Sequence, residues 1–245
     1  MTHTSPQTTI KNQRSLWFTL ALPPILFLFV IILASVYAGF VNQGDAAAIA
    51  EQVSQATPYV LLVVQLLLLG LFLWVRRTNG LSWADLGWQV QGGQTVGREL
   101  LLGAAIGAPL AVLYIFVLSP LMMTLQTTIG DYVPPDELIS SLGYAIVPFF
   151  LANVVLAPFV EENLYRGFAL PQLQKRYRFL TAFLLSCLFF GLLHWAGGFW
   201  YVILTGAVAG GVLAGLFVWR GNLLAPFAAH LALNIVEFLL IWLRQ

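Results

Sequence analysis

The chain has 245 residues, of which 60% are hydrophobic and 9% are charged, and its mean hydropathy is +0.86. This apolar surface exceeds what one soluble core can hide, so we expect a protein whose solvent is the lipid bilayer. The eleven basic residues are scattered rather than gathered in a stripe, so nucleic acid is not an expected partner. The single cysteine, Cys187, lies in an apolar run, and we interpret it as a small core residue.

Apolar segments long enough to cross a hydrocarbon core of about 30 Å follow one another along the chain. A charge-free run from 179 to 219 is about twice the length of one span, and Gly197-Gly198 lies near its middle, so we divide it into two helices. The sequence predicts an all-α, polytopic transmembrane bundle of about seven spans, with six to eight as the range. The expected spans are 17–40, 57–75, 100–122, 141–160, 179–196, 200–219 and 222–243.

Basic residues indicate how this bundle is oriented. In a seven-span arrangement they fall on one side, and the positive-inside rule makes that side cytoplasmic. We therefore expect the N-terminus in the cytoplasm and the C-terminus outside. The first apolar segment is too long for a signal peptide, and we expect it to remain as a helix. The basic residues used are Lys11, Arg14, Arg76, Arg77, Arg98, Lys175, Arg176, Arg178 and Arg220.

Two further segments carry structural information. The connection 79–93 contains Trp83-Ala-Asp-Leu-Gly-Trp88, whose tryptophans suit the headgroup layer. We interpret it as an interfacial helix, with an ordinary loop as the alternative. In the sixth span, small residues at four-residue spacing predict a face on which another backbone packs closely. These small residues are Gly206, Ala207, Gly210, Gly211 and Gly215.

An ionisable side chain inside a span costs about 2.5–3.5 kcal/mol on insertion scales, so each one retained is a functional-site candidate. The fourth span is followed by Glu161-Glu162 and then Arg166. On a helix, Glu162 and Arg166 are spaced for a salt bridge, whereas Glu161 points about 100° away. An unpaired glutamate in a low-dielectric environment is suited to act as a general base. The alternative is that this segment lies at the membrane surface, where charges cost little.

Polar groups occur within the last spans as well. His194 follows Phe190 by four residues, and taken alone it also fits a hydrogen-bonded core histidine. His230 and Asn234 are one helical turn apart, so they share a face and can donate two hydrogen bonds to one acceptor. Glu237 continues this face, either in the same cavity or as the partner of a buried polar group on another helix.

A base, two imidazoles and an amide donor are the groups that hydrolysis of a peptide bond requires. Glutamate and histidine inside spans also build the proton relays of transporters, but we find no matching pair of interrupted helices in two inverted halves. A membrane scaffold or immunity factor without turnover is a further alternative. Activity alone separates these alternatives.

The three motifs, in this order on late helices, resemble the CPBP family of intramembrane proteases. That family includes the type II CAAX prenyl endopeptidases and the bacteriocin-processing Abi proteins. The resemblance covers roughly residues 141–243, with the motifs Glu161-Glu162-Arg166, Phe190-His194 and His230-Asn234. It implies that Glu161, assisted by His194, activates a water, and that His230 and Asn234 bind the oxyanion. Glu162, Arg166 and Phe190 then have supporting roles.

The resemblance also implies a class of substrate, and it raises the question whether the reaction uses zinc. The substrate is expected to be a membrane-associated or lipidated, CAAX-like peptide, with membrane lipid as the surrounding partner. We favour a metal-free mechanism, while Glu161, His194 and His230 are the ligands of a zinc-dependent alternative. We expect the protein in the cytoplasmic membrane of a bacterium. The chain then divides into N-terminal transmembrane helices with the interfacial segment (1–140) and a CPBP-type catalytic core (141–245).

Overall fold

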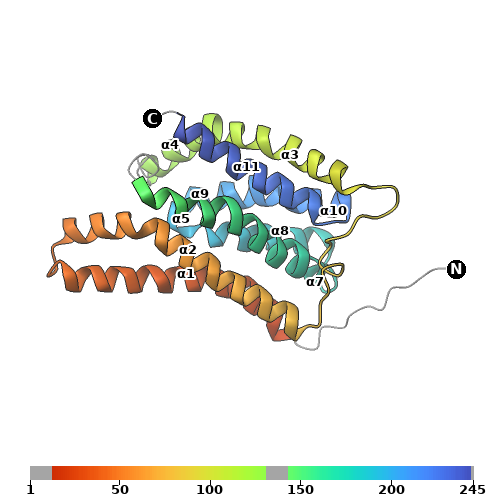
Figure 1. Cartoon of the computed structure of the whole chain (residues 1–245), viewed down its shortest axis with the longest axis horizontal. Coiled ribbons are helices and arrows are strands. Elements are labelled where there is room, and N and C mark those ends of the chain that lie inside the picture. Colours follow the sequence, from red (N-terminus) through yellow and green to blue (C-terminus); the bar gives the residue numbers. More distant parts are fainter. Residues whose placement is uncertain (1–12, 131–142, 244–245) are drawn as a thin grey trace.

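The structure is a computed structural model, and it describes residues 13–130 and 143–243. Every regular element in these two ranges is a helix. Five continuous helical segments are long and apolar enough to cross a membrane, and two further apolar helices are shorter. Figure 1 shows them packed as one bundle, with α1 beginning at one end and α11 ending at the other. The prediction of an all-α, polytopic membrane bundle is confirmed. Lys11 and the expected boundary at residue 140 lie outside the described residues.

Seven helical segments correspond to the seven expected spans. The first three are α1 (Gln13–Val41), α2 (Ala46–Thr78), and a continuous helix made of α3 (Val96–Leu113), η1 (Tyr114–Leu118) and α4 (Ser119–Ile129). The fourth consists of η2 (Gly143–Ala145), α5 (Ile146–Phe150), η3 (Leu151–Leu156), α6 (Ala157–Glu161), η4 (Glu162–Ala169) and α7 (Leu170–Gln174). The last three are α8 (Phe179–Leu193), the segment α9 (Phe199–Leu204), η6 (Thr205–Gly210) and α10 (Gly211–Arg220), and α11 (Leu224–Trp242). A short 3-10 turn, η5 (Trp195–Gly197), links α8 to α9.

The fourth segment is longer than expected. It runs from Gly143 to Gln174, so the Glu161-Glu162 pair lies inside a continuous helix rather than near its end. In this part of the helix Glu162 and Arg166 pair with each other and are fully buried. On either side of the five-residue α6, the stretches η3 and η4 are π-helical. Such π-bulges are frequent at functional sites, and here Glu161 ends α6 and Glu162 begins η4.

The interfacial helix expected at 79–93 is absent, because this part of the chain forms turns. Asp85 accepts hydrogen bonds from the backbone N–H and the hydroxyl of Ser82, and Gly87 adopts a φ of 93°. The bonds from Ser82 also lower the pKa of Asp85, a group in a loop outside the membrane-spanning helices. The indole of Trp88 donates to Asn163 Oδ1 at 2.9 Å. Trp88 therefore ties this connection to the fourth helical segment.

Small residues bring α8 and η6 together, as the spacing in the sixth span predicted. A Cβ on Gly206 would lie 2.8 Å from the carbonyl oxygen of Cys187, and a Cβ on Gly191 would lie 2.4 Å from that of Val202. Cys187 itself is buried. Gly211 and Gly215 have no such close neighbour, so only part of the predicted stripe forms the contact. This packing positions the end of α8, where His194 follows.

A second close contact, which the sequence analysis did not anticipate, joins α3 to α11. A Cβ on Gly107 would lie 1.9 Å from the carbonyl oxygen of Ala229. The start of α11 is held by an ion pair in which Arg220 Nε and Nη2 donate to both oxygens of Glu99, at 2.9 and 2.6 Å. Asn222 donates to the same carboxylate. These contacts fix α11, and Figure 1 shows α3 and α11 side by side.

Candidate active site

Glu161 lies at the end of α6 and is 3% exposed. Its Oε1 atom accepts a hydrogen bond of 3.0 Å from Gln65 Nε2 of α2. Its Oε2 atom is buried and has no hydrogen-bond partner in residues 13–130 and 143–243. One oxygen is thus held in place, while the other is available to a bound molecule. Gln65 was missed in the sequence, although a lone glutamine in a charge-free span is itself a clue.

Glu162 forms a buried network with two other charged or polar side chains. The salt bridge expected from the four-residue spacing is present, with Arg166 Nη1 2.8 Å from Glu162 Oε1 and both side chains fully buried. The same oxygen accepts a hydrogen bond from His230 Nδ1 at 2.9 Å. Arg166 also donates to the carbonyl oxygen of Gly210 at 3.1 Å. Glu162 therefore connects η4 to α11 and orients the His230 ring through its Nδ1 atom.

Phe190 packs against both imidazoles. Its ring centroid lies 5.0 Å from that of His194 and 5.9 Å from that of His230. The guanidinium carbon of Arg166 lies 4.1 Å from the centre of the same ring. Phe190 is 1% exposed, so it cannot move without displacing these neighbours. Its ring therefore sets the separation of the two histidines.

The surroundings of His194 determine its tautomer. His194 Nδ1 lies 2.8 Å from the carbonyl oxygen of Phe190, and because a carbonyl can only accept, Nδ1 carries the hydrogen. The neutral ring then presents the lone pair of Nε2. A histidine oriented in this way can accept a proton or a hydrogen bond through Nε2.

Asn234 is oriented by a backbone carbonyl on the fourth helix. Its Nδ2 atom donates to Asn153 O at 2.6 Å. Asn153 lies in the π-helical stretch η3, where its carbonyl would pair with the N–H five residues later, but that residue is Pro158. Because proline has no N–H, the carbonyl is left for Asn234. The second amide hydrogen of Asn234 remains available.

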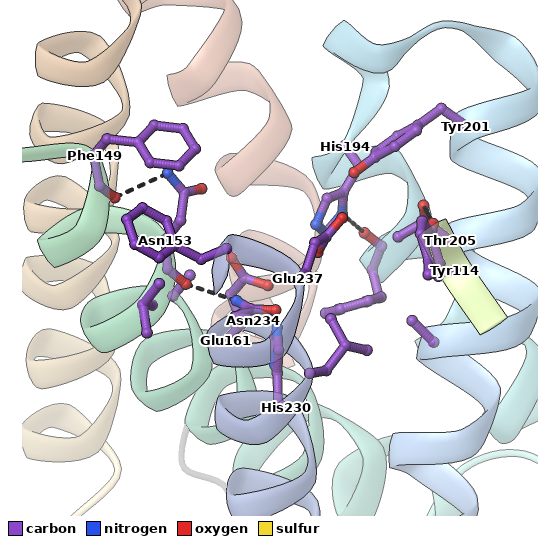
Figure 2. Close-up of a pocket in the computed structure, with 16 residues that line it drawn as sticks. Tyr114, Phe149, Asn153, Glu161, His194, Tyr201, Thr205, His230, Asn234 and Glu237 are labelled. Atoms are coloured by element: carbon purple, nitrogen blue, oxygen red, sulfur yellow. Dashed lines mark hydrogen bonds between the residues drawn. The ribbon is translucent and has the colours of Figure 1, made fainter. Parts of the chain in front are cut away.

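The four predicted catalytic residues line one cavity of about 220 Å³. Glu161, His194, His230 and Asn234 come from α6, the end of α8 and α11, and Figure 2 shows them around this space. The supporting pair Glu162 and Arg166 does not line the cavity. Sequence reasoning missed other lining residues, because aromatic and small polar side chains in an apolar span carry no motif. These are Tyr114, Asn153, Tyr201 and Thr205, of which Tyr114 and Thr205 are hydrogen-bonded through their hydroxyls.

Zinc ligation was the alternative for this site. Across residues 13–130 and 143–243, no group of three or more His, Cys, Asp or Glu side chains is arranged so that it could hold a metal ion. Glu161, His194 and His230 line the same cavity without forming such a group. The metal-free reaction stays a prediction, and we derive no chemical step through a metal.

A comparison with known families identifies the C-terminal region. Residues 143–236 match the family described as type II CAAX prenyl endopeptidase Rce1-like. The match covers less than half of the chain, and it is a likeness of this region to that family. The matched residues contain the three motifs and all four lining residues with predicted catalytic roles, so the resemblance inferred from the motifs is confirmed. No curated protein and no solved structure matches the chain.

Proposed function

We propose that this chain is an intramembrane endopeptidase in which Glu161 activates a water molecule. The observation that carries the proposal is the convergence of Glu161, His194, His230 and Asn234 on one cavity inside an apolar helical bundle. The four side chains come from three separate helical segments. The match of residues 143–236 to the family described as type II CAAX prenyl endopeptidase Rce1-like supports the same reaction.

The first step is the attack of water on the peptide carbonyl. Glu161 Oε2 has no other partner, and His194 Nε2 carries a lone pair, so each can accept one hydrogen of a water bound between them. The water oxygen bonds to the carbonyl carbon while its proton passes to Glu161. The carbon–nitrogen bond then breaks, and Glu161 returns the proton to the leaving amine. Gln65 keeps the glutamate in one orientation throughout.

The tetrahedral intermediate needs donors for its oxyanion. Asn234 offers the amide hydrogen that it does not use on Asn153. His230 offers Nε2–H when its ring is protonated, and Glu162, which accepts from Nδ1, is the carboxylate that stabilises this cation. The role of Glu162 in this proposal is thus to support His230.

For the substrate we propose a membrane-associated or lipidated peptide of CAAX-like character, because the site lies among helices that cross the bilayer. We propose the metal-free reaction, since Glu161 and His194 together supply the base. The basic residues at one end of the bundle support an orientation with the N-terminus in the cytoplasm, in a bacterial cytoplasmic membrane.

Cleavage by purified protein tests the proposal. In lipid nanodiscs, the wild type is expected to cut a membrane-proximal or lipidated peptide, and Glu161→Ala and His194→Ala are expected to abolish cleavage. Glu51→Ala is the matched control, because it removes an exposed acid of α2 that does not line the cavity. Unfolding temperatures show whether each variant remains folded. Undiminished cleavage by folded Glu161→Ala protein would contradict the mechanism.

A further inference from the structure

The cavity has an unbalanced charge. Its lining contains two carboxylates, Glu161 and Glu237, and no lysine or arginine, so the one cation that the proposed reaction places there, the protonated ring of His230, balances only one of them. The buried cation near the cavity, Arg166, is already paired with Glu162. In the low-dielectric interior of a helical bundle, a cleft with a net negative charge attracts positively charged ligands. The site therefore favours a substrate that brings a positive charge.

Glu237 is the carboxylate that the proposed reaction does not use. It follows His230 by seven residues and Asn234 by three on α11, so the three share one face. No hydrogen bond or ion pair of its carboxylate is formed within the described parts of the chain, whereas Glu161 is held by Gln65. Figure 2 shows Glu237 among the side chains that surround the cavity. A largely buried carboxylate without a partner is costly, and a cationic ligand would offset this cost.

Aromatic rings line the same cavity. Phe149 and Phe238 are two of them, and their ring centroids lie 6.4 Å apart with an interplanar angle of 28°. Tyr201 is a third. A cavity that contains both carboxylates and aromatic rings can bind ammonium and guanidinium groups, through the charge and through cation–π attraction.

We propose that Glu237 binds a positively charged group of the substrate, a lysine or arginine side chain close to the scissile bond. The three-residue step from Asn234 to Glu237 corresponds to about 4.5 Å along the helix axis. An extended peptide advances about 3.3–3.6 Å per residue. The charged side chain therefore belongs to a residue one or two positions from the carbonyl whose oxyanion Asn234 binds. The inference rests on the proposed function, and it adds the selection of substrate.

The test is a cleavage profile. Wild type, Glu237→Gln and Glu237→Lys, each as the full chain in nanodiscs, are incubated with a diverse peptide library, and cut sites are read by mass spectrometry. The wild type is expected to prefer lysine or arginine at one fixed position near the cut, Glu237→Gln to lose the preference, and Glu237→Lys to prefer aspartate or glutamate there. Glu51→Gln is the matched control for removal of an acid.

Two peptides that differ at this position, one with lysine and one with uncharged norleucine, then give the magnitude. The ratio of kcat/KM for lysine over norleucine is expected to fall at least tenfold in Glu237→Gln, mainly through KM. An unchanged ratio in Glu237→Gln would overturn the proposal. An equal loss of kcat on both peptides would also overturn it. Wild-type cleavage without any basic preference would overturn this inference alone. A wild type that cuts no peptide would overturn the proposed function as well.

Discussion

Replacing Glu162 by glutamine removes the anion from a fully buried network. The carboxylate accepts hydrogen bonds from Arg166 at 2.8 Å and from His230 at 2.9 Å. Without it, the guanidinium of Arg166 remains in the protein interior, where its described contacts are the carbonyl of Gly210 and the ring of Phe190. Breaking one partner of a buried ion pair costs about 3–5 kcal/mol, and we expect the free energy of unfolding of Glu162→Gln to fall by that amount.

The double variant Glu162→Gln/Arg166→Met separates the two roles of this carboxylate. Both charges are removed together, so most of the lost stability is expected to return. Activity is not expected to return, because His230 still lacks the carboxylate that stabilises its protonated ring. Loss of an oxyanion donor lowers kcat by about 100-fold or more, and we expect a loss of this size.

Stability is measured by steric trapping in bicelles and activity by the cleavage rate of a membrane-proximal peptide, with Glu51→Gln as the control for an exposed acid. Unchanged stability of Glu162→Gln would refute the buried pair as a structural element. A double variant that regains both stability and wild-type kcat would show that Glu162 serves only as the counter-ion of Arg166. The reasoning about His230 would then be wrong.

Three further predictions concern the surroundings of the site. In Gln65→Leu, Glu161 loses its donor, and because hydrogen bonds to charged groups contribute about 1.5–3 kcal/mol, steady-state kinetics should show kcat at least about tenfold lower. Gly107→Ala forces a Cβ against the backbone of α11, and overpacking of this kind typically costs about 1–3 kcal/mol of folding stability. We expect a lower unfolding temperature for this variant. The control Gly97→Ala, which has open space around the new Cβ, should not lower the unfolding temperature. Treatment with a chelator should leave activity intact, and metal analysis of the active protein should find no stoichiometric zinc. A stoichiometric zinc whose removal and return switch activity off and on would overturn the metal-free reaction.

The number of helical segments and the polar residues that line the cavity could be predicted in part from the sequence, because each depends on local information. Apolar length marks the spans, and charged or polar residues within or beside them mark the site. The ion pair of Glu162 with Arg166 was also predictable, since it follows from helical spacing alone. The length of the fourth helix was not, because the burial of its polar side chains depends on Gln65 and His230 of other helices.

Contacts between helices could not be read from the sequence. Gln65 meets Glu161 across 96 residues, and His230 meets Glu162 across 68. Helices that are apolar on all sides give no periodic pattern that indicates which faces meet. At 79–93 the sequence left an interfacial helix and an ordinary loop open, because a tryptophan suits a membrane interface and a protein interior equally well, and the structure has turns.

The most direct test of Glu161 as the base is a substrate trap. Wild type and Glu161→Gln are expressed in membranes, bound peptides are captured by crosslinking, and mass spectrometry determines whether each captured peptide is intact. The glutamine keeps the shape of the side chain but cannot accept the proton of water. We predict intact substrate on Glu161→Gln and the cut product from the wild type. Cut product from Glu161→Gln at the wild-type rate would contradict the account.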